Sequence, residues 1–100
     1  MAYEVKWSPE AVEDVEAIAA WIGRDSPQHA EALVDRLLQV VAALDHNPFR
    51  GRVVPEFEDS SYRETFVFSY RVIYRVDPAA VVVIAIVHGK RLLENIPRRE

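Results

Sequence analysis

The sequence predicts an α+β fold with the element order β-α-α-β-β-β, in which a helical hairpin packs on one face of a mainly antiparallel sheet. Two Ser-Pro pairs each precede a run of apolar residues at helical spacing. Three runs rich in Val, Ile and aromatic residues follow, separated only by short turns. Half of the 100 residues are apolar, so residues 1–100 are expected to form one domain with a sizeable core.

Local signals predict the first three elements. Residues 2–7 alternate weakly between apolar and polar side chains, as a strand does. Ser8 and Ser26 can each cap a helix, because a serine oxygen accepts from free amides and the proline that follows suits the first helical position. Gly23 is expected to end the first helix, and the second should stop at Pro48. The short linker makes the helices antiparallel neighbours.

The second half of the sequence predicts a loop followed by three strands. Residues 49–61 contain a proline, a glycine and two serines and form the longest loop. Residues 62–67 and 70–76 are two strands joined by a tight hairpin. Residues 80–87 are almost wholly Val, Ile and Ala, which is typical of a central strand buried on both faces. Residues 92–96 are expected to form a short last turn.

Large apolar side chains are expected in the core between helices and sheet. This prediction covers both tryptophans and the leucine stripe of the second helix: Trp7, Trp21, Leu33, Leu37 and Leu44. Apolar residues left over on the helices would be candidates for a partner groove.

Arginines recur at strand spacing in the second half. In residues 70–76, Arg71 and Arg75 fall on one face, and the tyrosines and valines fall on the other. We expect the helices to cover the apolar face. The opposite face is then expected to be a shallow open surface that carries Arg63, Arg71 and Arg75, or some of them.

These arginines could bind phosphate. Arg63, Arg71 and Arg91 lie on or next to adjacent predicted strands, and a guanidinium fork grips phosphate and stabilises developing negative charge. The alternative is that the arginines pair with nearby carboxylates, namely Glu64, Asp77 and Glu94. The sequence leaves both readings open.

His88 is the candidate general acid or base. The alternative is a histidine that caps the end of a strand, because no carboxylate lies nearby in sequence to orient it. The carboxylates of the first helix complement its dipole and have no histidine at metal-ligand spacing: Glu10, Glu13, Asp14 and Glu16. Glycine-rich phosphate loops and HExxH patterns are absent from the sequence, so we expect no cofactor and no metal.

Charge and composition exclude other classes. The net charge is −4, with −5 in residues 1–50 and +1 in residues 51–100, which counts against an extended nucleic-acid footprint. There is no cysteine, so disulfides and thiolate chemistry are excluded. The N-terminal residues lack a signal-peptide pattern and the longest apolar run is too short to cross a bilayer. We therefore expect a cytoplasmic protein without a membrane partner.

Five segments together resemble the RelE/ParE toxins of bacterial type II toxin–antitoxin, plasmid-stabilisation-like modules. In chain order they are WSPEAVEDVEAIAAWI, DSPQHAEALVDRL, NPFRGRVVPEF, YRETFVFSYRVIYRV and VVVIAIVHGKR. The resemblance covers nearly the whole chain and implies the same β-α-α-β-β-β fold. It also implies an antitoxin encoded alongside, whose tail wraps the toxin, and contact with DNA only through that antitoxin.

The resemblance implies two possible activities. RelE-like toxins cleave messenger RNA on the ribosome, and here Arg63, Arg71, His88 and Arg91 would be the catalytic set. ParE-like toxins inhibit DNA gyrase without catalysis. Thr65 stands where the nuclease branch often has a lysine, and no tyrosine stands near the end of the chain.

The ParE-like branch is therefore favoured. In that branch the expected target-binding residues are Arg63, Arg71, Arg75 and Arg91. The alternatives are a ribosome-dependent mRNA endonuclease, in which His88 replaces the missing tyrosine, and an inert member retained as half of an antitoxin complex.

Overall fold

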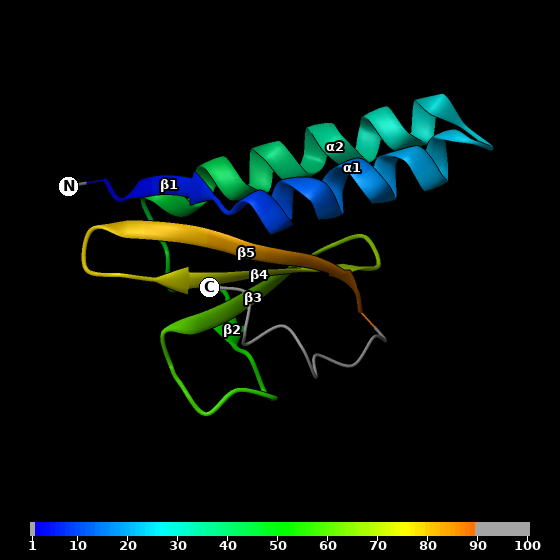
Figure 1. The fold of residues 1–100 in the computed structure, drawn as a ribbon. Coiled ribbons are helices and arrows are strands. Elements are labelled where there is room, and N and C mark those ends of the chain that lie inside the picture. The colour runs from blue at the N-terminus through cyan, green and yellow to red at the C-terminus, as the bar shows by residue number, and fades with distance from the viewer. Residues whose placement is uncertain (1, 90–100) are drawn as a thin grey trace.

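The computed structural model describes residues 2–89. Two helices lie side by side above one sheet, so the molecule has a helical layer and a sheet layer (Figure 1). The elements are β1 (Glu4–Trp7), α1 (Pro9–Gly23), α2 (Pro27–Ala42), the 3₁₀ turn η1 (Ala43–Asp45), β2 (Arg52–Val53), β3 (Tyr62–Val67), β4 (Tyr70–Val76) and β5 (Ala80–His88). The predicted α+β architecture is confirmed, with the short strand β2 as an addition inside the predicted loop.

Both helices begin as the sequence predicts. The Ser8 hydroxyl accepts from the backbone N–H of Ala11 at 3.1 Å, and the Ser26 hydroxyl accepts from His29 at 3.2 Å. Proline follows each cap and lacks the N–H that would otherwise be left without a partner. The predicted second helix is divided at its end, where α2 gives way to η1.

The sheet has the strand order β1-β5-β4-β3-β2 (Figure 1). β1 runs parallel to β5, and all other neighbouring strands are antiparallel. β5 therefore lies inside the sheet, and its residues 83–87 are buried, which confirms the predicted central strand. Phe68 and Ser69 close the tight β3–β4 hairpin, and Phe68 has the uncommon positive φ of 53°. No helix within residues 2–89 is both long and apolar enough to cross a membrane.

The helix side of the sheet holds the larger apolar core. Leu33, Leu37 and Leu44 are buried there as predicted, together with Val72 and Tyr74 of β4. Burying each such side chain stabilises the fold by roughly 1.5–3 kcal/mol. Trp7 is half-buried against this cluster. Trp21 was wrongly predicted as core, because its side chain lies at the outer end of α1 and is 68% exposed.

The opposite face of the sheet is not the open surface that the sequence predicted. A second apolar cluster covers part of it, with Val54 of the 49–61 loop buried against Ile73 and Ile84. Phe57 and Tyr62 pack edge to face beside it, with ring centroids 5.1 Å apart. The loop therefore covers part of this face, and the buried polar side chains of the sheet, Glu64 and Arg71, lie on it.

Candidate functional site

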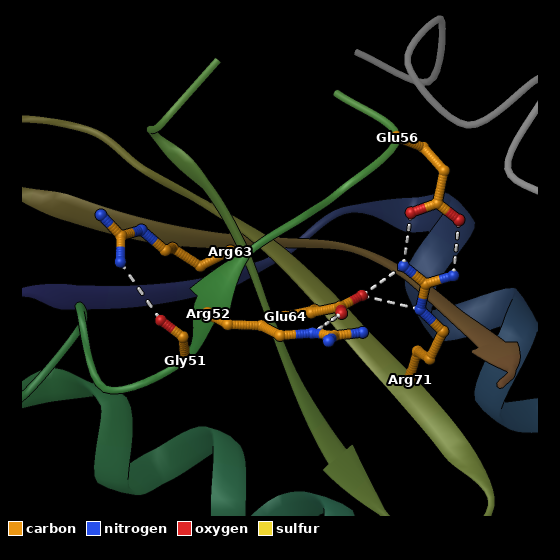
Figure 2. A network of polar contacts seen from close by, with 6 residues as sticks. All are labelled: Gly51, Arg52, Glu56, Arg63, Glu64 and Arg71. Carbon is orange, nitrogen blue, oxygen red and sulfur yellow. Dashed lines mark hydrogen bonds and ion pairs between the residues drawn. The ribbon is translucent and has the colours of Figure 1, made fainter. Parts of the chain in front are cut away.

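Arg71 lies on the loop-covered face and is almost fully buried, with 4% of the residue exposed. Its Nε donates to Glu64 Oε1 at 2.7 Å, and Nη2 contacts the same oxygen. Nη1 and Nη2 donate to the two carboxylate oxygens of Glu56 at 2.8 and 2.9 Å. Two carboxylates thus hold the guanidinium, one from β3 and one from the loop (Figure 2).

Glu64 is shared between two arginines. Its side chain is fully buried, with Oε1 bound by Arg71 and Oε2 by Nε of Arg52. The strand register creates this arrangement, since Arg52 lies directly opposite Glu64 and Arg71 lies opposite Phe66, two residues further along β3. The four side chains Arg52, Glu56, Glu64 and Arg71 form what we call the arginine–glutamate network, and their formal charges sum to zero.

The contacts within the network shift the pKa values of Glu56 and Arg71. The hydrogen bonds from Arg71 lower the pKa of Glu56 below its ordinary value, against the opposing effect of burial. The same contacts with Glu56 are the largest cause that raises the pKa of Arg71. Both shifts favour the charged forms, so the Arg71–Glu56 ion pair is ionised at neutral pH.

Arg63 lies on the other face of the sheet. It pairs with Tyr74, which faces the helices, whereas Arg71 pairs with Phe66. Its Nε donates to the carbonyl oxygen of Ser60 at 2.9 Å and Nη1 donates to that of Gly51 at 3.2 Å. Figure 2 shows Arg63 reaching toward Gly51, away from Arg71. The guanidinium also lies over the ring of Phe49, 5.0 Å from its centroid.

Gly51 closes the loop onto the sheet. Its backbone N–H donates to the hydroxyl of Tyr74 at 3.1 Å. A Cβ at this position would lie 2.5 Å from both the Glu64 carbonyl oxygen and the Tyr74 hydroxyl, so only glycine fits without a shift. Burial raises the pKa of Tyr74, which keeps the phenol protonated.

Arg75 lies on the same face as Arg71, at the other end of β4. Nε and Nη2 donate to the two carboxylate oxygens of Asp77 at 2.8 and 3.1 Å. Arg91 and the predicted turn at residues 92–96 lie outside the described residues. The pairing of Arg71 with Glu64 and of Arg75 with Asp77 follows the structural alternative that the sequence left open.

His88 is exposed at the end of β5, on the helix side of the sheet. Its ring meets that of Tyr70 edge to face, with centroids 5.7 Å apart. A small pocket of about 180 Å³ is lined by His88, Tyr70 and Asp14 of α1. Asp14 Oδ2 accepts from the backbone N–H of Ile86 at 3.0 Å, which places a carboxylate in the histidine's pocket.

Metal-binding geometry is absent from the part of the chain between residues 2 and 89, where no three His, Asp or Glu side chains could hold an ion together. Of the acidic residues on α1, Asp14 instead satisfies a strand amide that β1 is too short to reach.

The comparisons with known proteins identify the family. A family model described as the ParE toxin of the type II toxin–antitoxin system parDE matches residues 5–93. The chain belongs to this toxin family. No curated protein matches it by sequence.

Three of the solved structures that share this fold are bacterial toxin–antitoxin proteins. A chain of the chromosomal ParDE system from P. aeruginosa has a TM-score of 0.73 and 20% identity, covering 89% of this chain and 98% of that one. A chain of the toxin–antitoxin complex RelBE2 from Mycobacterium tuberculosis has a TM-score of 0.59 and 22% identity, and the match covers 88% of this chain and 92% of that one. A chain of the YoeB dimer from Staphylococcus aureus has a TM-score of 0.61 and 15% identity, and the match covers 88% of this chain and 98% of that one. At these identities the likeness concerns the fold alone.

Within residues 2–89, this ParE-family toxin does not bring its predicted nuclease residues Arg63, Arg71 and His88 together. Arg71 points to the loop-covered face, while Arg63 and His88 belong to the helix side. Arg63 lies opposite Tyr74 and His88 lies opposite Tyr70, so four residues of β4 separate them, roughly 13 Å at the usual strand rise. Arg63 and Arg71 therefore lie on opposite faces of the sheet, and their side chains do not converge on one phosphate. Whether Arg63, Arg71, Arg75 and Arg91 bind a target stays a prediction.

Three residues of this toxin's polar sites were not found from the sequence. Arg52 and Glu56 belong to the GRxxPE segment, which drew attention only through the resemblance, although its spacing places both on one loop. Asp14 could not be found because the residue that it contacts, Ile86, is 72 positions away. Only the helix–sheet packing brings Asp14 to His88.

Proposed function

We propose that this type II toxin acts as a ParE-like inhibitor of DNA gyrase and that a cognate antitoxin neutralises it. The observation that carries the proposal is the state of Arg71. Its guanidinium makes four contacts with two carboxylates and is almost fully buried. A cation neutralised in this way is poorly placed to stabilise the charged transition state of RNA cleavage. A toxin that acts only by binding its target does not need a free cation to stabilise a transition state.

The family match supports the same branch, because the matching model is that of ParE toxins rather than of ribosome-dependent nucleases. The antitoxin partner is supported by the solved neighbours, two of which are described as toxin–antitoxin assemblies. Within this proposal Arg71 serves the fold. The arginines that remain partly accessible, Arg63 and Arg75, are the candidates for target contact.

The test is a gyrase assay with purified toxin. We expect loss of supercoiling and accumulation of gyrase-bound cleaved DNA as the toxin concentration rises. Adding the protein encoded by the neighbouring gene should restore supercoiling. Undiminished supercoiling at saturating toxin would contradict the proposal.

A RelE-like endonuclease is the second candidate, and one observation favours it. His88 is exposed, and Asp14 lines the same pocket, so a carboxylate is available on the side from which a catalytic imidazole could be oriented. This candidate predicts new transcript 5′ ends within codons after induction. Those ends should disappear in His88→Ala, whose exposed position makes the substitution safe for folding. Unchanged transcript ends on induction of the wild-type toxin would exclude it.

A further inference from the structure

The turn between β3 and β4 presents an aromatic ring in a backbone conformation that aromatic residues avoid. Phe68 has a φ of 53° and is 70% exposed. Two-residue hairpin turns usually place Asn, Asp or Gly at a positive φ, because a larger side chain is strained there. A buried ring could offset this strain by packing, but most of the Phe68 surface stays in water. The fold therefore gains little from a phenylalanine at this position.

The ring borders an apolar pocket of about 280 Å³. The pocket lies at the end of the molecule where the α1–α2 turn and the β3–β4 hairpin come together (Figure 1). The hairpin is held there because the carbonyl oxygen of Ser69 accepts from the backbone N–H of Gly89 at 2.7 Å. We call this the hairpin pocket, and its walls come from the two helices and the hairpin: Ile22, His29, Ala32, Leu33, Phe68, Ser69 and Tyr70.

A second exposed aromatic ring lies at the same end. Among the large apolar side chains exposed within residues 2–89, Phe68 and Trp21 are the two most exposed. Trp21 directly precedes Ile22, which lines the hairpin pocket. The guanidinium carbon of Arg24 lies 5.3 Å from the centroid of the Trp21 ring. Aromatic and arginine side chains gathered around a pocket are the usual composition of a protein-binding hot spot.

We propose that Phe68 and the hairpin pocket form the apolar contact through which this toxin grips the protein surface of its gyrase target, a proposal that rests on the proposed function. Phe68 would enter an apolar hollow of the target, and an apolar side chain of the target would enter the hairpin pocket. This explains the strained turn, because positions that cost stability persist where function requires them. The contact adds an apolar anchor to the target contacts proposed for Arg63 and Arg75.

The charge at this end favours a protein surface over nucleic acid. Among the described residues, those that line the hairpin pocket include no lysine, arginine, aspartate or glutamate. The neighbouring Arg24 and Asp25 carry opposite charges that sum to zero. Nucleic-acid affinity depends on phosphate contacts with cations, which these residues do not supply. A neutral, apolar protein surface matches better, because burial of apolar area is then the main gain on contact.

The experiment measures gyrase trapping and urea unfolding of Phe68→Asn. Asparagine tolerates a positive φ and lacks the ring, so the variant should unfold at the wild-type urea concentration or a higher one. The toxin concentration for half-maximal trapping of cleaved DNA should rise about tenfold or more. Phe68→Tyr keeps the ring and should stay within about threefold of the wild type. The control Leu38→Gln changes another large side chain, 53% exposed on α2, and should trap as the wild type does.

A second pair of variants tests the pocket itself. Ala32→Met fills part of the hairpin pocket with a good helix former and should weaken trapping by several-fold. Ala20→Met adds the same side chain at an exposed position of α1 and should leave trapping unchanged. Equal weakening by both variants would indicate a general effect of added bulk and would overturn the proposal.

Other results also overturn it. A folded Phe68→Asn that traps cleaved DNA as well as the wild type would show that the ring has no part in target contact. A wild-type dimer that this variant converts to a monomer without loss of trapping would assign the pocket to a second copy of the chain. Binding of the wild type to duplex DNA without gyrase, if lost in Phe68→Asn, would assign the pocket to nucleic acid.

Failure of the proposed function gives a different result. A folded wild type that does not trap cleaved DNA at all would contradict gyrase inhibition, and this inference would fall with it. Trapping by the wild type together with full trapping by Phe68→Asn would contradict this inference alone.

Discussion

The loop-covered sheet face and the helical layer use charge in opposite ways. Residues 50–89 carry five acidic and five basic residues, and three of these arginines pair with carboxylates: Arg52, Arg71 and Arg75. Residues 9–42 carry a net charge of −5 beside an exposed apolar groove. Most of the conspicuous arginines are therefore paired with carboxylates of the same molecule. The helical layer instead keeps an excess of exposed acids.

Glu64→Ala should have the largest effect on stability, because it disrupts the internal charge pairing of the loop-covered face. It removes the buried carboxylate that Arg52 and Arg71 share, and leaves the buried Arg71 with Glu56 alone. We expect a loss of about 3–5 kcal/mol in the free energy of unfolding, measured by urea denaturation. The double variant Glu64→Leu/Arg71→Met should recover much of that loss, because it removes both buried charges. A loss below about 1 kcal/mol in Glu64→Ala would show that the network contributes little to stability.

Gly51→Ala tests how tightly the loop closes over the same face. The added methyl would overlap the Glu64 carbonyl oxygen and the Tyr74 hydroxyl, both 2.5 Å from the ideal Cβ. We expect a loss of about 2 kcal/mol or more in thermal and urea unfolding. Gly23→Ala is the control, because its Cβ would meet nothing nearer than 3.7 Å. Equal effects of the two substitutions would contradict the close approach at Gly51.

Glu56→Gln tests the tether between loop and sheet. The partly exposed carboxylate contributes about 1 kcal/mol through its paired hydrogen bonds to Arg71. Because the folded-state pKa of Glu56 lies below its ordinary value of 4.5, this contribution is fully present above pH 4.5. It is lost as the pH falls through the lowered pKa. The difference in unfolding free energy between wild type and variant should therefore be present at pH 7 and vanish in strong acid. A difference that grows on acidification would contradict the assignment.

Glu16→Gln should have the smallest effect on stability, because within residues 2–89 the exposed acids of the helical layer are not paired with arginines as the acids of the loop-covered face are. The side chain is exposed in a layer with an excess of acids, so its removal should change the free energy of unfolding by less than about 0.5 kcal/mol. Relief of repulsion makes a slight gain the expected sign. A loss comparable to that of Glu56→Gln would mean that the helical layer also uses its acids internally.

The sequence predicts the fold well because its signals are local. Ser8 and Ser26 cap their helices as expected, and the hairpin at Phe68 lies where two residues separate two strands. The two-residue strand β2 is missed because it has too few residues to show a period. Trp21 is misplaced because the side of α1 that packs on the core runs through Ile18 and Ile22, which leaves Trp21 exposed.

The candidate site is less predictable, because it depends on contacts that alternation cannot describe. Strand period places Arg71 and Arg75 on one face correctly, yet it does not reveal that the loop covers that face. The same period, applied across the hairpin, would have put Arg63 on the opposite side once the register with Tyr74 was known. Register is a property of the pair of strands, and no single strand carries it.

The most direct test of the account follows the double variant Glu64→Leu/Arg71→Met in a gyrase cleavage assay, after circular dichroism has established that it folds. If Arg71 serves the fold and the toxin acts by binding alone, this variant should trap cleaved DNA on gyrase within about twofold of the wild type. A folded variant that no longer traps cleaved DNA would contradict the account, because Arg71 would then contact the target itself.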